Sequence, residues 1–154
     1  MTIDAVNPDG LARPSGFSHA VVTTGGRLVF LAGQTALDAS GSVVGADVVA
    51  QFEQALANLL TALRAAGGRA EHLTSLTIYA TDLADYRRHA REMGAVWRRL
   101  AGSRYPAMAA VGVSRLWEAA AVVEVQGFAV IDDPGTADGD EKGTGTGTPL
   151  TSGT

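Results

Sequence analysis

The chain has 154 residues, no cysteine and a net charge of −4, with a pI of about 5.2. Its length allows one domain with a sizeable core. The acidic balance argues against a nucleic-acid or anionic-membrane surface, because binding polyanions needs concentrated Lys and Arg. The lack of cysteine excludes disulfides and thiolate nucleophiles. With no signal peptide and no apolar run long enough to span a bilayer, we expect a cytoplasmic protein.

The N-terminal third predicts an arm followed by two short strands. Residues 1–16 contain two prolines and show no periodicity, so we expect an extended or flexible arm, about 1–14, before the folded domain. Strands are predicted over 19–24 and 27–32. Gly25-Gly26 between them predicts a hairpin turn, because paired glycines supply the positive φ that such turns need. Residues 42–45 are a candidate for a further short strand.

The middle of the chain predicts two helices separated by a strand. Asp47 is placed to cap the first helix, which ends at Gly67-Gly68. Its apolar residues recur on one helical face: Phe52, Leu56, Leu59, Leu60 and Leu63. A strand is expected over 73–81. A second helix, capped by Asp82, runs to Gly102 and has the buried stripe Tyr86, Met93, Trp97 and Leu100.

Two apolar runs, 104–116 and 122–131, predict two strands near the heart of a sheet. The order of elements predicts an α+β fold, with two helices on one face of a mixed sheet. Nothing remains in the chain to cover the other face, because residues 132–154 form a Gly/Thr-rich tail that we expect to be disordered. We therefore expect another copy of the protein to cover that face.

Several short motifs together resemble the Rid/YjgF family, the reactive intermediate deaminases. They lie in the family's order between about residues 15 and 131: Phe17-Ser18-His19-Ala20-Val21, Phe30-Leu31-Ala32-Gly33-Gln34, Asp82-Leu83-Ala84-Asp85-Tyr86, Tyr105-Pro106-Ala107 and Val113-Ser114-Arg115-Leu116. The resemblance implies a chorismate-mutase-like fold. It also implies a homotrimer around a central β-barrel, with a ligand cleft between each pair of subunits.

In the family's deaminases, an arginine after Pro-Ala grips the substrate carboxylate, and the first glutamate of a Glu-x-Glu pair handles water. This chain has Met108 at the arginine position, whereas Glu124 matches the glutamate and Gln126 replaces its partner. The other polar positions that have become apolar are Phe17, Ala32, Ala90, Ala109 and Ala110. We therefore predict that 2-aminoacrylate deaminase activity is lost, because methionine cannot offset the desolvation of a substrate carboxylate.

The candidate residues each have a structural alternative. Glu124, with a pKa raised by apolar surroundings, is the candidate acid or base, although an interface ion pair would also explain it. His19 and Gln126 are further catalytic candidates or structural polar groups. The predicted substrate-binding lining is Phe17, Ala32, Gly33, Met108, Ala110, Val111 and Trp117. Met108 alone would suit a core, and Trp117 would suit an interface as well as a lid.

No metal or cofactor is expected, because the three histidines are far apart in the sequence and no phosphate-loop pattern is present. Two functions remain open. The first is an enzyme of specialised metabolism that acts on a non-carboxylate imine, enamine or ketone in an apolar cleft. The second is a non-catalytic trimer that binds a metabolite or a protein. The ribonuclease-like behaviour of some family members is disfavoured by the acidic chain.

Overall fold

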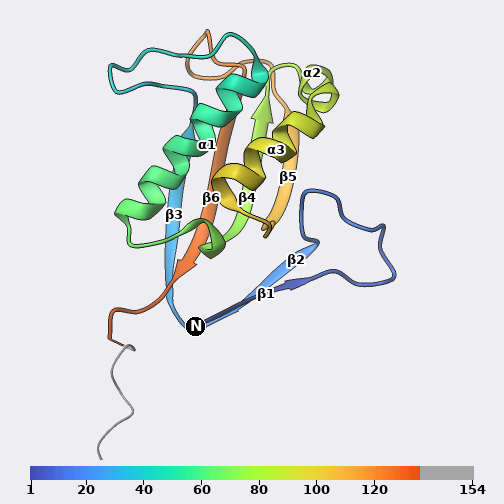
Figure 1. The fold of residues 1–154 in the computed structure, drawn as a ribbon, viewed down its shortest axis with the longest axis vertical. Helices are drawn as coiled ribbons and strands as arrows, with labels where there is room; N and C mark the ends of the chain where they lie inside the picture. The colour runs from blue at the N-terminus through green and yellow to red at the C-terminus, as the bar shows by residue number, and fades with distance from the viewer. Residues whose placement is uncertain (136–154) are drawn as a thin grey trace, which may run out of the picture.

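The computed structural model describes residues 1–135 (Figure 1). Most of the predicted disordered tail, 136–154, lies outside the described residues. Within residues 1–135, no helix combines the length and the apolar character that crossing a membrane would require.

A mixed four-stranded sheet forms the centre of the fold. Its strands follow the order β3 (Arg27–Gln34), β6 (Val123–Ile131), β4 (Leu73–Ala80) and β5 (Ala107–Gly112). β6 pairs antiparallel with both β3 and β4, and β5 pairs parallel with β4. The prediction that both final strands lie near the heart of the sheet is right for β6 and wrong for β5. β5 is an edge strand, and Ala109, Ala110 and Val111 on it are exposed within the described chain.

The helices α1 (Val48–Ala65), α2 (Leu83–Arg88) and α3 (Ala90–Ala101) lie on one face of this sheet, as predicted (Figure 1). A 3₁₀ turn, η1 (Ala70–His72), precedes β4. All five predicted core positions of α1 are fully buried, because its apolar stripe packs against the helix side of the sheet. The second predicted helix is divided at His89, so α2 and α3 are separate elements.

Both predicted helix caps are confirmed. The Asp47 carboxylate accepts a hydrogen bond from the Ala50 N–H at 2.8 Å, and the Asp82 carboxylate accepts one from the Asp85 N–H at 2.9 Å. Each satisfies a backbone donor that has no partner within the first helical turn. These local interactions explain why the helix starts could be placed from the sequence.

The N-terminal strands differ from the prediction. Residues 1–16 contain β1 (Thr2–Val6), which pairs antiparallel with β2 (Ala20–Thr24) as a separate two-stranded sheet that extends away from the main sheet (Figure 1). The predicted hairpin of β2 with β3 is wrong, because β3 pairs with β6 instead. Gly25 and Gly26, with φ of 69° and 85°, redirect the chain from one sheet to the other. Residues 42–45 contribute only an isolated bridge, Leu37–Val43.

The sheet face opposite the helices carries large apolar side chains. Phe30 on β3 is 72% exposed, and its ring makes an edge-to-face contact with Phe128 on β6, the ring centres lying 5.3 Å apart. Leu28 is also exposed on β3. Exposed aromatic and aliphatic groups gathered on one face are typical of a surface that another molecule covers.

Candidate functional site

Strand register divides the predicted site residues between the two faces of the sheet. Met108 and Ala110 on β5 lie beside Leu76 and Ile78 on β4, which are buried in the core on the helix side. Val111, in contrast, lies beside Tyr79, and Tyr79 pairs with Glu124. Because residues directly opposite each other in neighbouring strands share a face, Met108 faces the helices and Glu124 faces the open side. One chain therefore does not bring Met108 and Glu124 together.

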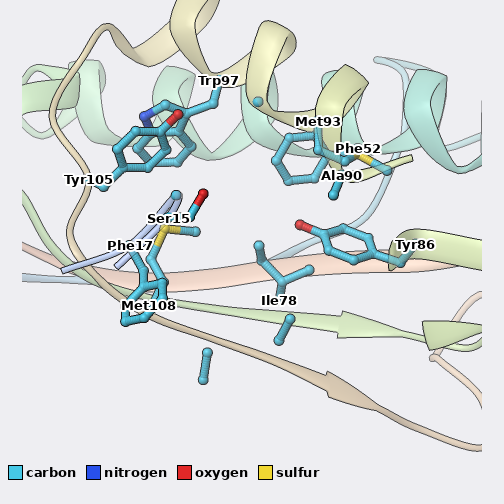
Figure 2. A pocket seen from close by; sticks show the side chains of 14 residues that line it. Ser15, Phe17, Phe52, Ile78, Tyr86, Ala90, Met93, Trp97, Tyr105 and Met108 are labelled. Atoms are coloured by element: carbon cyan, nitrogen blue, oxygen red, sulfur yellow. The ribbon is translucent and has the colours of Figure 1, made fainter. Parts of the chain in front are cut away.

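The helix-side group lines a pocket of about 230 Å³ between the β5 edge and the helices (Figure 2). Of the predicted residues, Phe17, Met108 and Ala110 belong to it. The other lining residues are Ser15, Gly16, Phe52, Ile78, Tyr86, Ala90, Met93, Gly94, Trp97, Tyr105 and Ala109. None of the fourteen carries a charge, so the pocket is walled by apolar groups with a few hydroxyls.

Hydrogen bonds from Ser18 to the segment that leads into β5 hold the outer wall of the pocket. The Ser18 N–H donates to the Pro106 carbonyl at 2.9 Å, and the Ser18 hydroxyl donates to the Tyr105 carbonyl at 2.7 Å. These bonds hold the segment next to β5, which keeps Phe17 at the wall. The Trp97 and Tyr105 rings stack with centres 5.3 Å apart, and the Trp97 indole N–H donates to the Arg104 carbonyl at 3.0 Å.

Tyr86 presents a hydroxyl to the interior of this pocket. Its ring packs edge-on against Phe52, the centres lying 6.2 Å apart, and its hydroxyl points toward the middle of the pocket (Figure 2). Burial raises the pKa of Tyr86 to about 12, so the phenol is neutral at physiological pH. No side-chain or backbone group of residues 1–135 forms a hydrogen bond with this hydroxyl.

His19 lies beside the pocket wall and not inside it. Its ring contacts Phe17 edge-to-face at 5.2 Å, and its Nε2 lies 2.8 Å from the Ala12 carbonyl oxygen. It also lines a shallow hollow of about 320 Å³ with Ser75, Thr77 and neighbouring β5 residues. Holding the β1–β2 loop through Ala12 gives His19 a structural task, which favours the structural alternative for this residue.

Glu124 is half-buried on the open face, next to Gly33 on β3. A Cβ at Gly33 would overlap the Glu124 carboxylate, so glycine makes room for this side chain. Burial, and to a smaller extent the charge of Glu118, raises the pKa of Glu124 above that of an ordinary glutamate. Glu118 is itself held by Thr35, whose hydroxyl donates to it at 3.0 Å.

The remaining predicted residues also lie on the open side or in solvent. The Gln126 Oε1 accepts a hydrogen bond from the Tyr79 hydroxyl at 3.2 Å, which gives the amide oxygen a partner within the chain. Ala32 precedes Gly33 on β3 and is exposed. Trp117 is 95% exposed and does not line the pocket. Within residues 1–135, no cluster of His, Asp and Glu has the arrangement of a metal site.

Two features of the site are not predicted by the sequence. The helical periodicity predicts Tyr86 as part of a buried apolar stripe. Its hydroxyl is the one signal that distinguishes it from the core residues of that stripe. Glu118 lies in the connection between β5 and β6, and no local pattern relates it to Glu124. Both roles depend on contacts between segments far apart in the chain.

The comparison with known proteins assigns the family. The model of the family described as Endoribonuclease L-PSP matches residues 10–131. The chain belongs to this family, the YjgF/Rid/RutC proteins. The Rid protein YyfB from Yersinia pestis has a similar structure, with a TM-score of 0.76 and 32% identity over 85% of this chain and 100% of that protein. The Rid-type fold implied by the sequence motifs is therefore confirmed.

Two further proteins are similar to this chain over most of their length. Protein DfrA of Myxococcus xanthus is 36% identical over 132 residues, covering 84% of this chain and 97% of that protein. The 2-iminobutanoate/2-iminopropanoate deaminase of Capra hircus is 31% identical over 115 residues, covering 74% and 79%.

Proposed function

We propose that this Rid protein acts on an uncharged imine, enamine or ketone and does not take the carboxylate-bearing substrates of the family's deaminases. The observation that carries the proposal is the uncharged pocket around Met108. Met108 occupies the position at which the family resemblance places the arginine that grips a substrate carboxylate. Because none of its other lining residues is charged, the pocket holds no cation that could take over this task.

The cost of burying an ion supports this choice of ligand. Transferring a carboxylate from water into an apolar site costs several kcal/mol unless a cation or several donors compensate. A neutral ligand of similar size avoids this cost and gains from covering the aromatic and aliphatic walls. The deaminase among the relatives suggests that this chain also acts at a carbon–nitrogen bond. The proposed substrate differs from that of the deaminase because it carries no charge.

Glu124 is the proposed acid or base, and it requires a second copy of the chain. Within one chain the sheet separates Glu124 from the pocket around Met108. In a homotrimer of the family's type, the open sheet face would be covered, and Glu124 of the partner subunit would approach the pocket at the shared cleft. Its raised pKa suits proton transfer near neutral pH.

The alternative is a trimer that binds a metabolite without converting it. Contacts within the chain favour it: the Gln126 amide oxygen accepts from Tyr79, and the His19 ring lies against a backbone carbonyl. In that case Glu124 would be the only predicted catalytic side chain without a hydrogen bond inside the described chain. A ligand that saturates the pocket and is recovered unchanged would support this alternative.

The test is a deaminase assay on enamines generated in place from serine and from leucine. We expect the wild type to release no ammonia above the uncatalysed rate, and we expect Met108→Arg to gain activity, because the arginine restores a partner for the substrate carboxylate. The double variant Met108→Arg/Glu124→Gln is the matched control and should be inactive. Release of ammonia and 2-ketoacid by the wild type would contradict the proposal.

A further inference from the structure

The hydroxyls of the pocket are not equivalent. Ser15 is exposed, so water can satisfy its hydroxyl. The Tyr86 hydroxyl approaches the interior from the opposite side, next to Phe52 and Met93 (Figure 2). The indole N–H of Trp97 is already bonded to the Arg104 carbonyl. Tyr105 also brings a hydroxyl to the pocket, on the ring that stacks against Trp97. The Tyr86 hydroxyl is the candidate ligand-binding donor because it points toward the middle of the pocket and has no hydrogen-bond partner among residues 1–135 (Figure 2).

A free donor in such a place has a defined chemical preference. No fully buried side-chain donor or acceptor of residues 1–135 lacks a hydrogen-bond partner, so water in the open pocket reaches this hydroxyl. A ligand that accepts its hydrogen bond replaces that water and is oriented by the contact. With its pKa at about 12, the phenol holds its proton at physiological pH and does not attract a cation as a phenolate would. Its natural partner is a neutral acceptor such as a carbonyl oxygen or an imine nitrogen.

We propose that Tyr86 is a specificity-determining residue, whose hydroxyl donates a hydrogen bond to the carbonyl oxygen or imine nitrogen of a small neutral ligand seated beside Met108. This assignment rests on the proposed function, because it concerns the same pocket, and it adds the group that orients the ligand. The apolar body of the ligand would lie between the Trp97–Tyr105 stack and Ile78. A pocket of about 230 Å³ is smaller than the roughly 300–1,000 Å³ of drug-sized sites, so the ligand is small.

Three probes of similar shape separate the contributions of hydrogen bonding and charge. Cyclohexanone carries a carbonyl acceptor, methylenecyclohexane replaces its oxygen by a CH₂ group, and cyclohexanecarboxylate carries a charge. Binding to the full chain can be followed by NMR through the indole N–H signal of Trp97, which lines the pocket. Because the chain has two tryptophans, Trp117→Phe assigns this signal.

We expect Tyr86→Phe to weaken cyclohexanone binding about three- to tenfold, the usual effect of one neutral hydrogen bond, and to leave methylenecyclohexane binding within about twofold. Unchanged methylenecyclohexane binding also shows that the pocket of the variant is intact. Tyr79→Phe removes the same hydroxyl on the opposite face of the sheet, and it should leave cyclohexanone binding as in the wild type.

Two results would overturn the Tyr86 assignment: equal weakening of both neutral probes by Tyr86→Phe, or a Trp97 signal that cyclohexanone does not shift in the wild type. The proposed function fails separately. If cyclohexanecarboxylate binds more tightly than cyclohexanone, the pocket does take carboxylates, and the comparison of the two neutral probes still decides the role of Tyr86.

Discussion

At the scale of single residues, two carboxyl groups are shifted in opposite directions by their surroundings. Burial beside Gly33, together with the charge of Glu118, raises the pKa of Glu124. Hydrogen bonds from the Ser40 hydroxyl and from neighbouring backbone N–H groups lower the pKa of Asp38. Donors favour the charged form of a carboxyl group and desolvation disfavours it, so the two groups should affect stability with opposite dependence on pH.

We predict that Glu124→Gln is more stable than the wild type at pH 7 and that this difference shrinks toward pH 4. A carboxyl group whose pKa is raised in the folded state contributes stability below its unfolded pKa and loses that contribution as pH rises through the folded pKa. Glutamine removes the ionisation at nearly the same volume. Thermal unfolding of both proteins between pH 4 and pH 8 measures the difference, and a gap that widens toward pH 4 would contradict it.

Asp38→Asn is the comparison of opposite sign. The folded pKa of Asp38 is lowered, so its carboxylate stabilises the fold above the unfolded pKa and loses this effect as pH falls through the folded pKa. We predict that Asp38→Asn destabilises the protein at pH 7 and approaches the wild type in acid. The same unfolding series tests it, and destabilisation that is equal at every pH would point to a cause other than ionisation.

At the scale of secondary-structure elements, the contact between β6 and β4 depends on Gly127. A Cβ at this position would lie 2.6 Å from the Ser75 carbonyl oxygen, a backbone atom that no side-chain rotation can move away. Gly94 on α3 is different, because a Cβ there would meet only the end of the Arg98 side chain, at 3.6 Å. The two glycines therefore offer a matched pair of substitutions in a strand and a helix.

We predict that Gly127→Ala lowers the free energy of unfolding by roughly 1–3 kcal/mol, because β6 must shift away from β4 to admit the methyl group. Gly94→Ala should be neutral or add up to about 1 kcal/mol, since alanine favours the helix. Urea unfolding of the two variants measures both effects. A Gly127→Ala protein as stable as the wild type would show that the close approach of β6 to β4 is not required.

At the scale of the whole molecule, the sheet separates Met108 on the helix side from Glu124 on the open side. The open face also carries the exposed apolar side chains of Phe30, Phe128 and Leu28. Covering this face would bury apolar surface and could also complete the cleft. Assembly and function are therefore proposed to be linked: the same contact that hides the aromatic residues would bring Glu124 to the pocket of the partner subunit.

We predict that the wild type sediments as a trimer of its 15.8 kDa chain and that Phe30→Asp shifts it toward the monomer, because a charge would have to be buried in the interface. Ala62→Asp adds the same charge on the exposed side of α1 and should leave the trimer intact. Analytical ultracentrifugation distinguishes the two. A wild-type monomer, or an unchanged Phe30→Asp trimer, would refute the linkage.

Features set by neighbouring residues could be predicted from the sequence. The Asp47 and Asp82 caps, the buried face of α1 and the alternation along β4 depend on residues within a few positions of one another. The placement of the helices on one face of the sheet also followed from the order of elements. The predicted lining residues Phe17, Met108 and Ala110 do line one pocket, although Glu124, Gly33 and Gln126 lie on the other face.

The sequence by itself determined the family, the α+β fold and the replacement of the carboxylate-gripping arginine by Met108, because these reside in local motifs. Only the tertiary structure decided that β5 is an edge strand, that β2 pairs with β1 and not with β3, and that Tyr86 faces the pocket. Strand pairing joins residues far apart in the chain, and its outcome depends on the free energy of the whole sheet. The separation of the two halves of the site follows from that pairing.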